Sequence, residues 1–357
     1  MAYHSLWLQN FRSYRDDSIE FTPGVNIIVG PNGSGKTNLL EALYVLSQGA
    51  SFRVADKDLV RYNASGFRLE GLQEQQRRIL AYSPHGPGPT KQFSLDGVKK
   101  QRLSYQQRVP VVLFEPDELR LLTGSPSRRR VYMDTLLAQL WPEAARLKNQ
   151  FERALLQRNN ILKHSQHTAP RVLEDRLFVW NIKLAEYAAG LVARRLEVAR
   201  RYNQRIADLY ASIAQHPSEV EVCYQTDISL ANYKSNLLQQ LITHSAADAQ
   251  RGFTSAGPHR DDFSIMLNGK PAAVSASRGE TRTLVLVLKM IELELLAQQH
   301  DRPPLLLLDD VFSELDAARR QALARLSRQY QTIITTTDAD AIIKHFLEAD
   351  YNIIATG

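Results

Sequence analysis

The sequence predicts an α/β protein in which a nucleotide-binding head, built from a mixed sheet and an antiparallel lobe, is interrupted by an inserted helical arm. Residues 30–37 form a G-x-x-x-x-G-K-[ST] phosphate loop between an apolar run and an apolar helix. Residues 303–310 read as a buried strand ending in two aspartates. The chain between them is mainly helical in pattern. We expect the head over residues 1–118 and 252–357, and the arm over residues 119–251.

The composition is that of a globular protein, with 44% hydrophobic and 23% charged residues in 357. The net charge of +6, from 44 basic and 38 acidic residues, favours a polyanionic partner without selecting DNA by itself. Cys223 is the only cysteine, which excludes an intrachain disulfide and a multi-cysteine metal site. The sequence shows no export signal and no apolar stretch that predicts a membrane span. We therefore expect a cytoplasmic protein without a membrane partner.

The chain begins with a predicted antiparallel pair of strands. Apolar residues alternate over residues 3–21, with a turn near Ser13, and lead into an apolar run at 25–29. The phosphate loop follows, and residues 38–46 then continue as an apolar helix. Strand, loop and helix in this order are what phosphate binding requires, because the loop N–H groups and the helix N-terminus both face the anion.

Short apolar runs after this helix predict a small antiparallel lobe. The runs occupy residues 67–72, 77–82 and 93–95. The pair Asp96-Gly97 predicts a tight hairpin turn at the end of the lobe. Residues 109–114 form a further predicted strand, after which proline and glycine mark a change to long helices.

The arm is predicted from helical periodicity. Residues 127–164 indicate two helices separated at Pro142, and residues 228–249 indicate one helix. Apolar residues at spacings of three and four over residues 172–214 predict a single helix of about 65 Å. Two arginine clusters accompany these helices and are either solvated helix surface or contacts to DNA phosphates. They comprise Arg194, Arg195, Arg200, Arg201 and Arg205 along the long helix, and Arg128, Arg129 and Arg130 near its base.

The phosphate loop predicts an ATP site. Its glycines allow close approach to a polyphosphate, Lys36 would reach the β and γ phosphates, and the Thr37 hydroxyl would hold magnesium. The predicted nucleotide contacts are Gly30, Pro31, Asn32, Gly33, Ser34, Gly35, Lys36 and Thr37.

Two later segments would complete such a site. Asp309 would bind magnesium and Asp310 would polarise the attacking water, although an acidic helix cap after a core strand explains the same pair. The segment before the helix at 281–297 has the composition of a phosphate-binding helix start, but a capping serine is the common alternative. This segment is Ser277, Arg278, Gly279 and Glu280.

These motifs resemble the Walker A, signature and Walker B motifs of the ABC-type ATPases, with a D-loop at residues 313–316. Asn32-Gly33 is similar to the SMC-related branch. More closely, the chain resembles the RecF family, and the resemblance covers almost its whole length. It rests on residues 10–12, 51–53, 124–130 with Asp134, 257–262 and 335–337. The signature follows the phosphate loop by about 240 residues, which leaves room for one inserted domain but not for an SMC coiled coil.

The resemblance implies ATP and magnesium as cofactors and Lys36, Asp309 and Asp310 as catalytic residues. It also implies a homodimer, in which Ser277 and Gly279 of one copy complete the ATP site of the other. Such a dimer would clamp duplex DNA near single-strand to double-strand junctions and, with RecO and RecR, help to load RecA. The family's roles are DNA repair, replication and recombination, including the response to DNA damage.

Two departures from ABC-type ATPases suggest slow hydrolysis that acts as a timer. Residues 333–338 contain threonines where a switch histidine is usual, and Asp310 replaces the usual glutamate. The Q-loop is expected near residues 114–118, and His259 is either structural or a contact to nucleotide or DNA. Two other functions stay open: an SMC-like DNA-tethering ATPase, which a long arm or zinc hook would indicate, and a transporter ATPase subunit, which would need a membrane partner.

Overall fold

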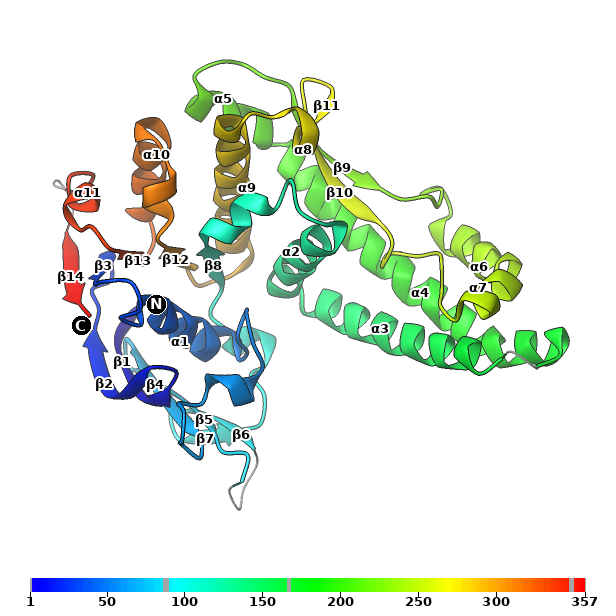
Figure 1. Ribbon diagram of the computed structural model, residues 1–357, viewed down its shortest axis with the longest axis horizontal. Coiled ribbons are helices and arrows are strands. Elements are labelled where there is room, and N and C mark those ends of the chain that lie inside the picture. Colours follow the sequence, from blue (N-terminus) through cyan, green and yellow to red (C-terminus); the bar gives the residue numbers. More distant parts are fainter. Residues whose placement is uncertain (1, 86–89, 166–167, 347–349, 357) are drawn as a thin grey trace. The chain divides into compact units, whose positions relative to one another are not determined.

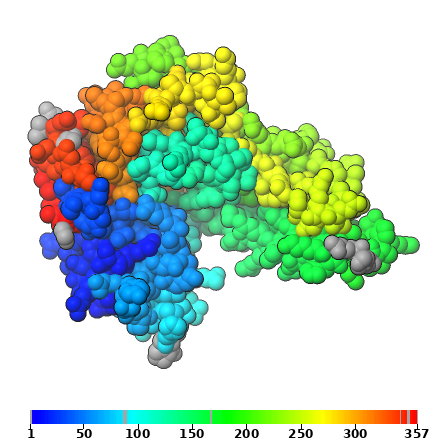
Figure 2. Space-filling view, in the orientation of Figure 1, coloured from blue at the N-terminus to red at the C-terminus, as the bar shows by residue number. Residues whose placement is uncertain are grey.

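The computed structural model describes residues 2–85, 90–165, 168–346 and 350–356. The chain divides into two compact units, which we call the head unit, Met1–Leu119 with Lys289–Gly357, and the arm unit, Arg120–Leu288. In Figures 1 and 2 the head unit runs from blue to cyan and from orange to red, and most of the arm unit is green and yellow. In the part of the chain that the structure describes, no helix combines the length and apolarity that a bilayer span requires.

The sequence placed the return to the head at residue 252, whereas the contact division places it at Lys289. The difference arises because β10 (Asp262–Leu267) pairs antiparallel with β9 (Val220–Gln225), so the segment after residue 252 packs with the arm unit. Its assignment to the ATPase head remains a prediction from its motif.

The centre of the head unit is a five-stranded parallel sheet with the order β14-β3-β13-β12-β8. All four residues 305–308 of β12 are buried, and such continuous apolar strands are typical of parallel sheets that are covered on both faces. The bounds are β3 Val25–Val29, β8 Val111–Phe114, β12 Leu305–Asp309, β13 Thr332–Thr336 and β14 Tyr351–Ala355.

The predicted antiparallel lobe is confirmed as a separate six-stranded sheet with the order β2-β1-β4-β5-β6-β7. In the described residues of the head unit, parallel pairing is thus confined to the central sheet and antiparallel pairing to this second sheet, so neither sheet is mixed. Asp96 and Gly97 both have positive φ, as a two-residue hairpin turn requires. The bounds are β1 Tyr3–Phe11, β2 Tyr14–Glu20, β4 Phe67–Gln73, β5 Gln76–Tyr82, β6 Lys91–Leu95 and β7 Val98–Lys100.

Helix α1 (Lys36–Gln48) joins the two sheets of the head unit through one apolar cluster. Leu43 of α1 lies in this cluster with Leu8 of the antiparallel sheet and Leu307 of the parallel sheet. The phosphate loop is therefore anchored on both sides. The other helices of the unit are η1 Asp56–Leu59, η2 Tyr105–Gln107, η4 Val311–Glu314, α10 Ala317–Ser327 and α11 Asp340–Ile343.

The arm unit is built on long helices. The predicted separation at Pro142 is confirmed, and prolines occupy the first turns of α2, α3 and α4, where a missing N–H costs no hydrogen bond. The bounds are α2 Pro126–Leu140, α3 Pro142–Lys163, α4 Pro170–Asn203, α5 Ile206–Ala214, α6 Tyr233–Thr243, α7 Ser245–Arg251, β11 Lys270–Pro271 and α8 Ala272–Ser275. Two helices cross the boundary between the units, η3 Pro116–Arg120 and α9 Arg278–Gln299.

The prediction of one helix over residues 172–214 is wrong. Helix α4 ends at Asn203, and Arg205 has a non-helical φ of −128° before α5 begins. The break allows α5 to pack on β9 and to bury Ile206 and Tyr210 completely. The 34 residues of α4 correspond to about 50 Å, not 65 Å.

The prediction of one helix over residues 228–249 is also wrong, because the segment forms α6 and α7 with a break at His244. Asn232 precedes α6 in the left-handed conformation, so residues 228–232 cannot extend the helix.

A buried ion pair ties the arm helices together. The side chains of Arg158 and Asp248 are 0% and 1% exposed and lie 2.8 Å apart. Arg158 also donates to the side chains of Asn181 and Thr254 and to the carbonyl of Leu241. Four helices or loops thus depend on one guanidinium.

We expect Arg158→Met to destabilise the protein by about 3–5 kcal/mol, because it leaves the Asp248 carboxylate buried without its cation. Urea unfolding measures the free energy. The matched control is Lys148→Ala on the same helix, whose exposed pair with Glu152 should contribute less than about 0.5 kcal/mol. A loss below 1 kcal/mol for Arg158→Met, or no recovery when Asp248→Leu is added, would contradict the role we give this pair.

Candidate functional site

The phosphate loop connects β3 to α1, and two of its glycines are required by close contacts. At Gly35, where φ is +97°, an added Cβ atom would lie 2.7 Å from Ser13 Oγ. At Gly30 it would lie 2.3 Å from the Thr356 carbonyl oxygen, so the last residues of the chain support the loop. Ser34 and Thr356 also share a hydrogen bond of 2.9 Å between their hydroxyls. No sequence signal indicated this support from the C-terminal strand.

Lys36 lies where the loop requires it, with its side chain folded over the loop. Its Nζ donates to the carbonyl oxygens of Gly30 at 2.6 Å and Pro31 at 2.8 Å, and the residue is 8% exposed. The ammonium group is therefore held at the mouth of the loop, beside the N-terminus of α1. A cation and a helix N-terminus converge there, which is an arrangement that favours a phosphate group.

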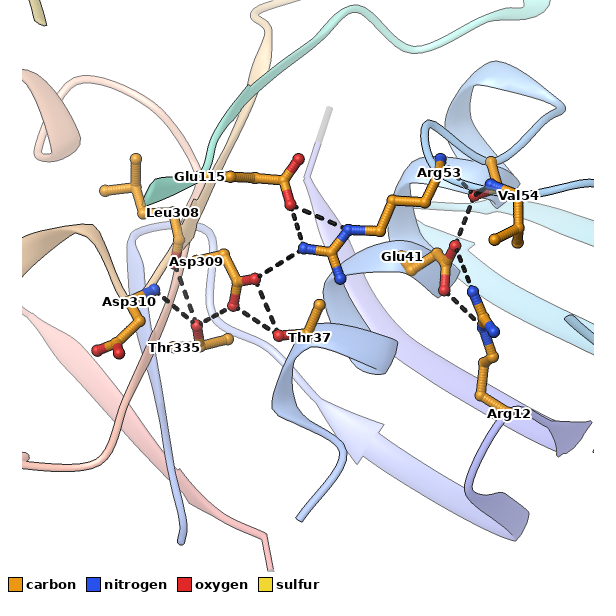
Figure 3. A network of polar contacts seen from close by, with 11 residues as sticks. Arg12, Thr37, Glu41, Arg53, Val54, Glu115, Leu308, Asp309, Asp310 and Thr335 are labelled. Carbon is orange, nitrogen blue, oxygen red and sulfur yellow. Dashed lines mark hydrogen bonds and ion pairs between the residues drawn. The ribbon is translucent and has the colours of Figure 1, made fainter. Parts of the chain in front are cut away.

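Asp309 is the centre of the site. It ends β12, is 7% exposed, and both of its carboxylate oxygens lie 2.9 Å from Thr37 Oγ1. Thr335 Oγ1 donates to Oδ1 at 2.7 Å, and Arg53 Nη2 approaches Oδ2 at 3.3 Å (Figure 3). The predicted pairing of Thr37 with Asp309 thus joins residues far apart in the sequence.

Arg53 and Glu115 belong to the site although the sequence assigned them no role in it. Arg53 pairs with Glu115, with its Nε 3.0 Å from Oε1, and so bridges Glu115 and Asp309. Burial raises the pKa of the Glu115 carboxyl, and Arg53 opposes that rise. Glu115 lies within residues 114–118, the segment in which we expected the Q-loop, and that position was the only signal for it.

A second layer of contacts positions the loop that carries Arg53. Ser51 Oγ donates to Glu41 Oε1 at 2.5 Å and accepts from the backbone N–H of Arg53 at 2.9 Å. Glu41 lies on α1, is 1% exposed, and is held by two hydrogen bonds from Arg12 (Figure 3). Glu41 therefore connects the phosphate-loop helix to the loop that carries Arg53.

Asp310 has a strained backbone and a perturbed carboxyl group. Its φ is +51°, and its N–H donates to the hydroxyl of Thr335 at 3.0 Å. Its carboxylate leaves the strand end in a different direction from that of Asp309 (Figure 3). Burial, and secondarily the charge of Asp309, raise the pKa of the Asp310 carboxyl. A raised pKa suits a group that accepts a proton.

The residues at this edge fit a magnesium nucleotide. An open cleft of about 470 Å³ is lined by the phosphate loop together with Arg53, Glu115, Asp309 and Asp310. Magnesium in proteins commonly takes one or two side-chain oxygens and completes its shell with water and phosphate. Thr37 and Asp309 offer such oxygens, and the described residues contain no cluster of three or more acidic, histidine or cysteine side chains that would form an all-protein cage.

The signature segment lies in the arm unit and forms a reciprocal helix cap. The Ser277 N–H donates to Glu280 Oε2 at 2.7 Å, and the Glu280 N–H donates to Ser277 Oγ at 3.2 Å. These bonds lower the pKa of the Glu280 carboxyl. Ser277 and Arg278 are exposed at the start of α9. The capping explanation therefore holds locally, and phosphate binding by Ser277 and Gly279 remains a prediction.

Two of the arginines that we considered as DNA contacts pair instead with acidic side chains of the arm unit. Arg195 is 2% exposed, is bonded to both oxygens of Asp134, and donates to the Pro258 carbonyl, so we withdraw it as a DNA contact. Arg129 is half-buried, but it donates two hydrogen bonds to Asp262 and two more to the carbonyls of Leu122 and Gly124, so we withdraw it because its guanidinium is fully engaged. The helical periodicity of the sequence shows on which side of a helix an arginine lies. It does not show that a buried aspartate pairs with that arginine.

The other candidates keep part of their surface accessible. Arg194 pairs with Glu143, Arg201 pairs with Glu197, and both guanidinium groups lie over the Trp141 ring. Arg128 is half-buried, and Arg130 donates to the carbonyl of Asp261.

His259 is structural in its local contacts. Its Nε2 bonds to the Thr254 carbonyl at 3.1 Å, and burial lowers its pKa to about 4. The ring packs near Phe151. The side chain is half-buried, and contact of His259 with nucleotide or DNA remains a prediction.

The fold and the site together define a class of protein. A parallel sheet carries a phosphate loop after one strand and paired aspartates after another, an antiparallel sheet covers the loop helix, and a helical unit is inserted between the two motifs. This is the head of an ABC-type ATPase of the SMC-like kind. Residues 3–353 match the family described as RecF/RecN/SMC N terminal domain.

The chain belongs to the RecF family. It is 34% identical over 349 residues to the DNA replication and repair protein RecF of Lactobacillus acidophilus, covering 94% of this chain and 92% of that protein. It is 35% identical over 353 residues to RecF of Geobacillus thermodenitrificans, with coverage of 96% and 94%.

Solved structures agree with this membership. The structure of the recombination mediator protein RecF-ATPrS in the RecFOR pathway matches with a TM-score of 0.86 at 29% identity, covering 96% of this chain and 94% of that one. An Smc head domain from Pyrococcus yayanosii matches with a TM-score of 0.52 at 14% identity over 99% and 94% of the two chains, which shows a shared fold.

We expect Arg53→Gln to tighten binding of a divalent cation to the nucleotide-free protein by about three- to tenfold, because it removes a positive charge that neutralises Asp309 and Glu115. Titration with Mn²⁺, followed by electron paramagnetic resonance of the free ion, measures the Kd. The control is Arg68→Gln, which breaks a half-buried pair with Glu70 on the antiparallel sheet. Unchanged or weaker Mn²⁺ binding by Arg53→Gln would show that Arg53 does not neutralise the cation site.

Proposed function

We propose that this protein is an ATP-dependent DNA-binding ATPase of recombinational repair. The observation that carries the proposal is the contact of Thr37 Oγ1 with both oxygens of Asp309 at 2.9 Å, beside the loop that holds Lys36. This contact unites the two halves of a magnesium-nucleotide site. Membership of the RecF family supports the same conclusion.

The residues of the head unit divide the chemistry among themselves. Lys36 and the loop N–H groups would hold the β and γ phosphates, and Thr37 and Asp309 would hold magnesium. Bound there, magnesium supplies positive charge to the phosphate oxygens. Asp310 would orient the attacking water and take its proton, and its raised pKa supports that role. Asp310 is one methylene shorter than glutamate, which we interpret as favouring slow hydrolysis that times release.

We further propose that ATP joins two copies of the chain. Each copy has one phosphate loop and one signature segment, so Ser277 and Gly279 of one copy would contact the γ phosphate held by Lys36 of the other. ATP favours the dimer only as far as it binds the dimer more tightly than the monomer. Loss of the γ phosphate would then remove the bridge.

The dimer would bind duplex DNA near single-strand gaps and act with RecO and RecR to help load RecA, in the cytoplasm. Similar structures are described as recombination mediators in the RecFOR pathway, one with ATP and one with ATPrS. Arg128, Arg130, Arg194 and Arg201 are the arginines we retain as candidate phosphate contacts. The net charge of +6 is in keeping with an anionic partner.

We expect ATP and magnesium to convert the wild-type protein from monomer to a dimer on gapped duplex DNA, and we expect Lys36→Met and Ser277→Arg each to abolish that step. Lys36→Met removes the positive charge that would contact the phosphates. Ser277→Arg places a bulky cation at the start of α9. Analytical ultracentrifugation measures the oligomeric state with and without nucleotide.

The matched controls are Lys99→Met and Ser229→Arg, which make the same changes at exposed positions in the same units. If all four variants dimerised equally, or if the protein bound DNA equally well with and without nucleotide, ATP would not control dimerisation and DNA binding. Mixing Lys36→Met with Ser277→Arg should restore one complete site per dimer, whereas action within a single chain predicts no recovery.

We expect Asp310→Asn to bind ATP normally and to prolong residence on DNA at least tenfold, because hydrolysis no longer removes the γ phosphate. Dissociation of fluorescent gapped duplex after addition of unlabelled competitor gives the residence time, and Lys36→Met is the variant that should not be retained at all. An unchanged dissociation rate for Asp310→Asn would show that release of the protein from DNA does not depend on ATP hydrolysis.

A further inference from the structure

Thr335 occupies the strand between the two halves of the candidate ATP site. The parallel sheet has the order β3-β13-β12, so β13 lies between the strand that leads into the phosphate loop and the strand that ends at Asp309. The register pairs Thr335 with Asp309 on one side and with Ile28 on the other. Thr335 is completely buried and is not among the residues that line the cleft.

The Thr335 hydroxyl makes two specific contacts, one with each aspartate. A threonine hydroxyl has a single hydrogen to donate and lone pairs that accept. Its oxygen is 2.7 Å from Asp309 Oδ1 and 3.4 Å from the Leu308 carbonyl, so the hydrogen belongs to the carboxylate. It accepts the backbone N–H of Asp310 at 3.0 Å, and the same N–H lies 3.2 Å from the Thr335 carbonyl oxygen, so the hydroxyl is one of two acceptors for it. One hydroxyl therefore orients the Asp309 side chain and the Asp310 backbone together.

The two contacts of the Thr335 hydroxyl support a strained backbone at Asp310 and a buried carboxylate at Asp309. Asp310 adopts φ +51°, a left-handed conformation that a non-glycine residue keeps only when its surroundings impose it. Asp309 accepts a hydrogen bond from Thr37, which lines the cleft. Thr335, which does not line the cleft, donates a second hydrogen bond to Asp309 Oδ1. The neighbouring hydroxyl does not share this role, because Thr336 bonds with the backbone of Asp338.

We propose that Thr335 is a positioning residue for both aspartates: it sets the direction of the Asp309 carboxylate toward a cation and holds Asp310 in its left-handed conformation. The inference rests on the proposed ATPase function and adds to it a residue that touches neither nucleotide nor metal. Thr335 lies in the segment 333–338, where ABC-type ATPases usually carry a switch histidine. The contacts of Thr335 instead direct its action to the Asp309 carboxylate and the Asp310 backbone.

The test compares Thr335→Val, which removes the hydroxyl at nearly constant volume, with Thr335→Ser, which retains it, and with Thr336→Val as the matched control. The first measurement is the Kd of Mn²⁺ for the ADP-bound protein. We expect Thr335→Val to weaken Mn²⁺ binding about tenfold, as loss of a partner behind a metal ligand commonly does, and the other two variants to stay within about twofold of wild type.

The second measurement is steady-state ATP hydrolysis at saturating Mg²⁺. Thr335→Val should lower kcat about tenfold with KM for ATP changed less than about twofold, because the phosphate loop is intact while Asp310 loses its anchor. Thermal unfolding shows whether each variant is folded. Should Thr335→Val not fold, Thr335→Cys, which keeps a weaker donor, takes its place.

Mn²⁺ affinity and kcat of Thr335→Val equal to those of Thr336→Val would overturn the inference. So would an equal loss in Thr335→Ser, because the hydroxyl would then not be the active group. Failure of the proposed function is a separate result: wild-type protein that binds no ATP and forms no ATP-dependent dimer. Mn²⁺ affinity and the dimerisation assay therefore distinguish the two.

Discussion

The carboxylate of Asp309 stands at the end of an apolar strand, almost out of contact with water, and such a group is costly unless polar partners surround it. Its partners come from three separate places in the fold: Thr37 on α1, Thr335 on β13 and Arg53 on the loop after α1. Two of these partners make further contacts: Thr335 accepts from the Asp310 backbone, and Arg53 pairs with Glu115. The nucleotide site is thus a set of residues assembled around one charge.

The order of the strands is what makes this assembly possible. With β13 between β3 and β12, the carboxyl ends of three parallel strands meet at one edge, and ligands of open α/β sheets bind at that edge. The arm unit is held by a comparable device. Arg158 with Asp248, and Arg195 with Asp134, are buried pairs that connect helices distant in the sequence. In both units, buried charged residues join elements that are distant in the sequence.

Much of the fold could be predicted because its signals are local. The phosphate loop, the Asp96-Gly97 hairpin and the helix break at Pro142 are each encoded within a few residues. The break in the long helix after Asn203 was missed, because the pattern of apolar residues continues through it and packing on β9 decides the direction. Arg53 was missed as a partner of Asp309, since 256 residues separate them and an ion pair leaves no periodic trace. Arg195 was assigned to the surface for the same reason.

The central sheet has a consequence for how the protein is made. Its second strand, β3 (Val25–Val29), is synthesised long before its neighbours β13 (Thr332–Thr336) and β14 (Tyr351–Ala355). Pairing across such sequence separations is slow and leaves unpaired strand edges exposed. The arm unit, Arg120–Leu288, is continuous in sequence and is synthesised between β3 and β13. The ATP site would therefore be completed only after the whole arm unit has been synthesised.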